Sequence, residues 1–151
     1  MKADVNGWLL LAAALSGIAS ALHVLIVFGG APWYRFFGAG ERMARMSESG
    51  HWWPALLTSG IALLLGLWAL YALTVSGAWA LPESLAWVLP WPRLALSLIT
   101  AIYCLRGLAL IPLQLFAPLQ VTPFLIWSSL ICLGYGLVHL IGVKQVWELL
   151  G

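Results

Sequence analysis

The sequence predicts an all-α integral membrane protein: a bundle of four transmembrane helices with an amphipathic interfacial helix in the first loop. Of its 151 residues, 63% are hydrophobic and only 8% are charged, whereas a soluble domain carries about 25% charged residues. Four apolar runs are each long enough to cross a hydrocarbon core of roughly 30 Å. Almost all tryptophans fall at or near the ends of these runs, as an aromatic belt at the membrane interface requires.

The first two predicted spans are bounded by glycine and proline. A short polar tail, residues 1–7, precedes the first span at 8–28. That span should end within residues 29–32, Gly-Gly-Ala-Pro, because proline cannot continue a helix and glycine suits its C-terminus. The second span is predicted over 54–75, since Pro54 suits the first turn of a helix.

The third and fourth predicted spans are joined by a tight, uncharged turn. The third covers 94–111 and could reach Phe116 with a kink at Pro112. The fourth covers 124–143 and is followed by a short polar tail. We therefore expect one four-span domain over residues 1–151.

The first loop, residues 33–53, is the one polar stretch that is neither a tail nor a short turn. It holds three of the seven basic residues and two of the five acidic ones. Glu41 and Arg45 are four positions apart and should pair on one helical face. Two methionines on another face should contact lipid or the bundle. This pattern predicts a short helix around 40–49 that lies in the interface.

Arg106 is the only formally charged residue inside a predicted span. A charge there costs about 3 kcal/mol on insertion scales, so it normally faces the interior and has a partner. Helical spacing places Tyr103 on the same broad face as Arg106. Glu41 and Glu48 are the only acidic residues able to reach its level. Either one of them pairs with Arg106 in a structural clasp, or the site is open to an external anion.

His23 and Thr58 extend this candidate site. The first and third spans run in the same direction, and a rise of about 1.5 Å per residue places His23 and Arg106 on the loop side of their midpoints. Thr58 opens the second span at that level. We therefore expect a ligand-binding pocket under the first loop, formed by Arg106, His23, Tyr103, Glu41, Glu48 and Thr58.

Several classes of site are not indicated. His23 and His139 lie on antiparallel spans and toward opposite halves of the bilayer, which argues against a bis-histidine haem or a shared metal ion. The two cysteines form no C-x-x-C motif, so neither a thiol relay nor a zinc ribbon is indicated. The net charge of +2 is too small to argue for nucleic acid. We expect no cofactor and no metal.

Two stretches carry a resemblance. The run Gly-Gly-Ala-Pro-Trp-Tyr-Arg-Phe-Phe-Gly-Ala-Gly-Glu-Arg-Met-Ala at 29–44, with Ile-Tyr-Cys-Leu-Arg-Gly at 102–107, resembles an uncharacterised group of small proteobacterial four-helix inner-membrane proteins. The resemblance would cover the whole chain. It implies a multi-pass location in the bacterial inner membrane, and it supplies neither an activity nor a site.

Three functions fit these features. The chain could bind or transport an anionic amphiphile such as a lipid head group, because arginine suits phosphate and carboxylate. It could be an accessory subunit whose aromatic faces pack on a membrane-protein partner or on a second copy. It could be an intramembrane lipid- or isoprenoid-modifying enzyme with His23 as acid–base and Arg106 as substrate anchor. We favour the first function, with membrane lipid as the partner, over an enzyme.

Overall fold

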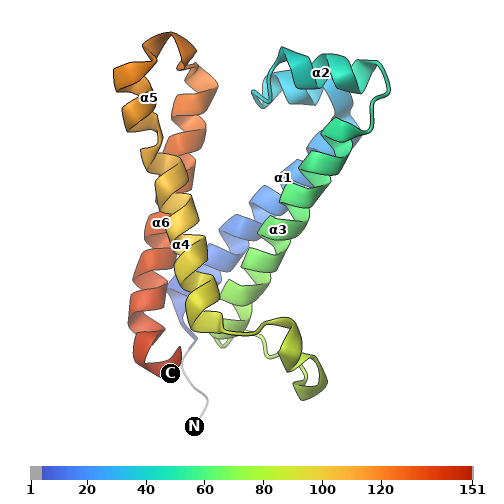
Figure 1. Ribbon diagram of the computed structural model, residues 1–151. Helices are drawn as coiled ribbons and strands as arrows, with labels where there is room; N and C mark the ends of the chain where they lie inside the picture. Colours follow the sequence, from blue (N-terminus) through green and yellow to red (C-terminus); the bar gives the residue numbers. More distant parts are fainter. Residues whose placement is uncertain (1–4, 151) are drawn as a thin grey trace. The chain divides into compact units, whose positions relative to one another are not determined.

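The structure, a computed structural model, describes residues 5–150, so residues 1–4 of the predicted tail lie outside the described range. The described residues form helices and no strand (Figure 1). The longer helices are α1 (Gly7–Phe36), α2 (Glu41–Glu48), α3 (Trp53–Val75), α4 (Pro92–Leu108), α5 (Leu110–Phe116) and α6 (Pro123–Val146). Three 3-10 turns complete the chain: η1 (Glu83–Val88), η2 (Pro118–Gln120) and η3 (Trp147–Leu150).

Four of these segments are long and apolar enough to cross a membrane, so the predicted all-α, four-span class is confirmed. They are Gly7–Phe36, Trp53–Val75, Pro92–Phe116 and Pro123–Leu150. The chain is therefore treated below as a multi-pass membrane protein.

Two helix ends differ from the sequence prediction. The predicted first span stops before residue 29, whereas α1 continues to Phe36 through a break at Gly30. Gly30 has φ 62° and ψ −148°, a combination open essentially to glycine alone. The apolar helix thus ends where predicted, and a short continuation points the chain into the first loop. The fourth helix runs three residues past the predicted end, to Val146.

The predicted kink near Pro112 is present as a break between α4 and α5. Helix α4 ends at Leu108 and α5 begins at Leu110. Proline lacks an N–H and its ring clashes with the carbonyl four residues earlier, and for Pro112 that residue is Leu108. The break therefore lies one turn before the proline itself.

Tryptophan exposure agrees with the predicted aromatic belt. Trp68, the one tryptophan placed mid-span by the sequence, is 8% exposed. The other nine, which lie at or near span ends, are all at least 37% exposed. Amphipathic indole rings in such positions anchor helix ends at the membrane interface.

The chain divides into two compact units, each described here by itself. One unit is Ser16–Leu67, and the other joins Met1–Leu15 to Trp68–Gly151. The predicted single four-span domain stays a prediction.

Within Ser16–Leu67, α1 and α3 pack side by side through small residues (Figure 1). The Ser20 hydroxyl donates to the carbonyl of Ala62 at 2.7 Å. A Cβ added at Gly66 would lie only 3.3 Å from the same hydroxyl oxygen. Small residues at a membrane helix interface let the two backbones approach closely.

The predicted loop helix is present as α2, and it packs against the end of α1 (Figure 1). Ala44 is fully buried and joins a cluster with Ile26, Ala31 and Tyr34, against which Met43 packs. Met46 is also half-buried. An amphipathic helix with its methionines turned inward, and not into solvent, is the arrangement that the spacing predicts.

Within the other unit, α4 and α6 run in close contact (Figure 1). A Cβ added at Gly136 would lie 2.9 Å from the Cys104 backbone nitrogen. One added at Gly107 would lie 2.8 Å from the Leu133 nitrogen. The two glycines therefore let the α4 and α6 backbones approach to a distance that no larger residue allows.

Candidate functional site

Arg106 lies in the last turn of α4, and its guanidinium points toward α6. Nη1 donates to Oγ of Ser129 at 2.9 Å, and Nη2 donates to Oγ of Ser128 at 3.2 Å. No carboxylate among the described residues forms an ion pair with Arg106. The arginine side chain is exposed, and the two hydroxyl groups orient its charge.

The two serines are held in place by α6. Ser129 is 1% exposed, and the Ser128 hydroxyl donates to the carbonyl of Leu125 at 3.1 Å. That bond uses the only proton of the Ser128 hydroxyl, so its oxygen presents lone pairs to the arginine. A guanidinium has five N–H donors, and most of them remain for another acceptor at Arg106.

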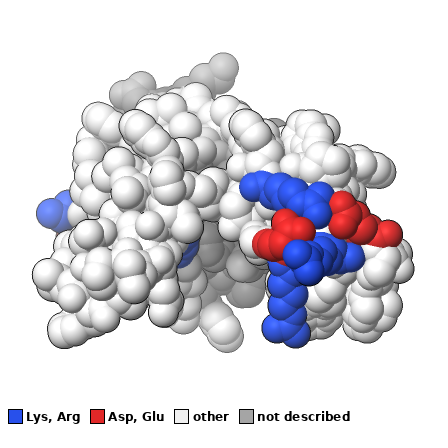
Figure 2. Space-filling view, turned by 90° about the horizontal axis from the view of Figure 1, so that it is seen from above, with Lys and Arg blue, Asp and Glu red and all other residues white. Residues whose placement is uncertain are grey.

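The loop carboxylates have a different partner from the one proposed for a clasp. Glu41 accepts from Arg35 Nε at 2.9 Å and from Arg45 Nε at 3.1 Å, which confirms the predicted Glu41–Arg45 pair. Glu48 accepts from Arg35 Nη1 at 2.7 Å. Figure 2 shows basic and acidic side chains gathered on this face of the molecule. Arg35 therefore pairs with both loop carboxylates, whereas the clasp alternative required one of them to pair with Arg106.

These ion pairs change the acidity of the loop carboxyls. Hydrogen bonds from Arg35 first and Arg45 second lower the pKa of Glu41 to about 2. The hydrogen bond from Arg35 also lowers the pKa of Glu48. A carboxyl with a lowered pKa in the folded state stabilises that state at pH values above its unfolded pKa. The contribution of Glu41 is therefore complete above about pH 4.5 and is lost as the pH falls through about 2.

A carboxyl titration tests this arrangement. The ¹³C resonance of the Glu41 carboxyl should titrate with a midpoint near pH 2, and not near the ordinary 4.5. Arg35→Gln should raise the midpoint toward 4.5, and Arg45→Gln should raise it less, because its hydrogen bond is the weaker cause. Arg42→Gln, which removes a charge that forms no ion pair among the described residues, is the control. A wild-type midpoint near 4.5 would show that Arg35 does not hold Glu41.

The other predicted pocket residues are distributed over both units. His23 is half-buried, and its Nδ1 lies 2.7 Å from the carbonyl of Ala19 on its own helix. No second ionisable side chain among the described residues is hydrogen-bonded to His23, and the enzyme hypothesis needs one. Thr58 is 6% exposed. Because His23 and Thr58 belong to one unit and Arg106 to the other, their shared pocket stays a prediction.

Tyr103 belongs to a buried aromatic cluster that the sequence analysis did not anticipate. Its ring centroid lies 5.0 Å from that of Trp68, 5.5 Å from Tyr135 and 5.2 Å from His139. His139 is fully buried, with Nδ1 2.9 Å from the Tyr135 carbonyl. Its Nε2 has no hydrogen-bond partner among the described residues. Tyr135 and His139 are four residues apart in the sequence, a spacing that places them on one face of the fourth span.

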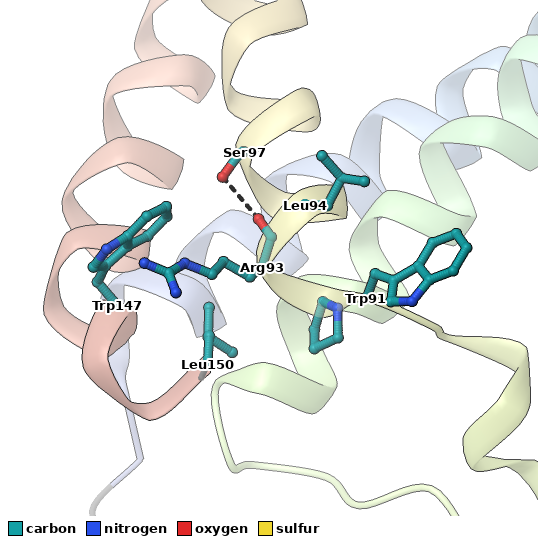
Figure 3. A pocket seen from close by; sticks show the side chains of 7 residues that line it. Trp91, Arg93, Leu94, Ser97, Trp147 and Leu150 are labelled. Atoms are coloured by element: carbon teal, nitrogen blue, oxygen red, sulfur yellow. Dashed lines mark hydrogen bonds between the residues drawn. The ribbon is translucent and has the colours of Figure 1, made fainter.

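A second feature missed by the sequence analysis is a groove along α4, α6 and η3. It consists of two adjoining cavities of about 720 and 670 Å³ that share Ser97 and Trp147 in their linings. We call it the α4–α6 groove. Arg93 and Lys144, two charges near the ends of predicted spans, line it. Figure 3 shows Arg93 of α4 reaching toward Trp147.

The described residues contain no group of three or more His, Cys, Asp or Glu side chains placed to hold a metal ion. Comparison of the chain with protein-family models, with characterised proteins and with solved structures finds no match. The functional argument therefore depends on the geometry of Arg106 and of the α4–α6 groove.

Proposed function

We propose that this protein binds an anionic amphiphile, such as a lipid with a phosphate or carboxylate head group, with Arg106 as the anion anchor. The observation that carries the proposal is the pairing of Arg106. Inside a membrane-spanning segment, its guanidinium contacts two neutral hydroxyls and no carboxylate among the described residues.

An arginine in this position needs a functional reason. A buried or intramembrane charge normally pairs with an opposite charge within the protein. Ser128 and Ser129 do not supply one, although they fix the direction of the guanidinium. Arginine presents a planar fork of donors that matches a phosphate or carboxylate in two-point contact. Anchoring an external anion would supply the missing charge.

The proposal modifies the predicted pocket. Glu41 and Glu48 are assigned to the first loop, where Arg35 holds them. Arg106 keeps its role as anchor, and Tyr103, which belongs to the same unit, stays a proposed neighbour of the ligand. We propose a location in the bacterial inner membrane on the strength of the resemblance described above.

The test is native mass spectrometry of the protein purified in mild detergent. The wild type should carry the mass of an anionic lipid-like molecule. Arg106→Gln should weaken binding at the Arg106 site by about 10- to 100-fold, because a hydrogen bond to a charged group contributes about 1.5–3 kcal/mol. Arg106→Lys should retain part of it, since the charge remains and the planar fork does not.

Two outcomes would contradict the proposal. One is equal retention of the lipid by the wild type and Arg106→Gln. The other is a wild-type protein that carries a partner polypeptide and no lipid, which would favour the accessory-subunit function. The double variant Ser128→Ala with Ser129→Ala should retain an intermediate amount of the lipid. The Arg106 charge stays in this variant, while the hydroxyls that orient it are lost.

A further inference from the structure

The α4–α6 groove combines two cationic side chains with an apolar lining. Arg93, in the first turn of α4, lines one cavity, and Lys144, in the last turns of α6, lines the other. Besides Lys144 and Glu148, the second cavity is lined by small and aliphatic side chains that include Ala101, Cys104, Leu140 and Val143. A groove of this kind suits an amphiphile with an anionic head and an apolar chain.

The positive charges of Arg93 and Lys144 are not neutralised by ion pairs among the described residues. The Arg93 guanidinium carbon lies 3.9 Å from the centroid of the Trp147 ring, a cation–π contact that leaves its charge in place. Neither Arg93 nor Lys144 forms an ion pair among the described residues. Among the described residues of the lining, the two cations outnumber the one carboxylate, that of Glu148.

The hydroxyl groups in the groove are already engaged with their own helix. Ser97 Oγ donates to the carbonyl of Arg93 at 2.7 Å, as Figure 3 shows, and Thr100 Oγ1 donates to the carbonyl of Leu96 at 2.7 Å. Each hydroxyl has a single proton, so neither can donate to a bound anion without breaking that bond. Recognition of an anion would therefore fall to Arg93 and Lys144.

The length of the groove matches one leaflet of a bilayer. From Arg93 to Cys104 there are eleven residues, and at about 1.5 Å per residue these cover roughly 16 Å of helix axis. That is about half of a hydrocarbon core of roughly 30 Å. Trp91 in the groove lining is 75% exposed, as expected of a tryptophan at the interface. A transmembrane helix would need a surface across both leaflets.

We propose that the α4–α6 groove is a binding site for one anionic phospholipid, with its phosphate between Arg93 and Lys144 and one acyl chain along α4 toward Cys104. This site is separate from the Arg106 anchor and does not depend on it. The two cavities, about 720 and 670 Å³, fall within the usual range of roughly 300–1,000 Å³ for ligand pockets.

The head-group contacts are tested with the delipidated full-length protein, titrated with phosphatidylglycerol and with phosphatidylcholine of identical chains. Native mass spectrometry should show a preference for phosphatidylglycerol that Arg93→Gln with Lys144→Gln weakens about 10-fold or more, since each cation attracts the anionic lipid. Arg42→Gln with Arg45→Gln removes the same charge from the first loop and should leave this binding unchanged. Equal phosphatidylglycerol binding by the wild type and the groove variant would overturn the site.

The chain contact is tested by filling the groove. Ala101→Trp should block the second cavity and weaken phosphatidylglycerol binding, while Ile102→Trp, an exposed neighbour outside the groove, should not. Glycerol phosphate, which has the head group and no chains, should bind far more weakly than the lipid. Equal binding of glycerol phosphate would make this a site for a free anion and would contradict the proposal. Arg106→Gln should leave the groove lipid bound, so failure here and failure of the Arg106 proposal are distinguishable.

Discussion

Replacing Arg106 with leucine should leave the thermal stability of the lipid-free protein unchanged or raised, while removing the part of the stabilisation by an anionic lipid that depends on Arg106. The substitution strands no carboxylate, because only the hydroxyls of Ser128 and Ser129 receive hydrogen bonds from Arg106. It also removes a charge that costs about 3 kcal/mol to place in a membrane helix. Loss of the two hydrogen bonds, one of them to the buried Ser129 hydroxyl, offsets part of that gain.

The effect of lipid follows from linkage. A ligand present at 100 times its dissociation constant stabilises the folded state by about 2.7 kcal/mol. Weakening its binding 100-fold at Arg106→Leu would remove most of this stabilisation. The measurement is a pair of thermal melts, with and without an anionic lipid, for the wild type and the variant. A large loss of stability in the lipid-free variant would show that Arg106 is a structural residue.

The second large effect is expected at Gly136. Gly136→Ala places a Cβ 2.6 Å from the Cys104 sulfur and 2.9 Å from the Cys104 nitrogen. The nitrogen belongs to the α4 backbone, so α4 and α6 must move apart. Overpacking of this kind typically costs about 1–3 kcal/mol. The same displacement would disturb the Arg106 hydrogen bonds to α6, so both stability and lipid retention should fall.

Gly134→Ala is the matched control, two positions away on the same helix. A Cβ at Gly134 meets nothing within 4 Å, and alanine is the better helix former by about 1 kcal/mol. Stability is measured by chemical denaturation in mild detergent or by a melt followed by tryptophan fluorescence. Gly136→Ala should be less stable than the wild type, and Gly134→Ala should be more stable. Equal stability of the two variants would show that α4 and α6 do not pack as closely as described.

The spans and the loop helix could be predicted because their signals are local. Apolar length predicts the spans, and the Glu41–Arg45 spacing with the neighbouring methionines predicts α2. The details that differ come from backbone chemistry at single residues. Gly30 takes a conformation available to glycine and lets α1 continue to Phe36, and Pro112 interrupts the helix one turn earlier than its own position.

The partners of the charged residues could not be predicted in the same way. Arg35 reaches Glu41 and Glu48 because the chain reverses between α1 and α2, where Gly38 and Gly40 have positive φ. The serine partners of Arg106 lie 22 and 23 residues further along the chain, so the α4–α6 register decides the contact.

The α4–α6 groove depends on tertiary structure for the same reason. Arg93 and Lys144 are 51 residues apart in the sequence. Each one, considered separately, is an ordinary charge at the end of a membrane span. Only the packing of α4 on α6 and η3 places them in two adjoining cavities, with Trp147 in both linings.

The most direct measurement of the central claim is a lipid competition in which the groove cannot contribute. Protein carrying Arg93→Gln and Lys144→Gln is delipidated and given equal amounts of phosphatidylglycerol and phosphatidylcholine with the same chains, and the bound lipids are counted by native mass spectrometry. With Arg106 intact, we expect an excess of bound phosphatidylglycerol that disappears when Arg106→Gln is added. The same excess in both proteins, or no excess in either, would contradict the assignment of Arg106 as the anion anchor.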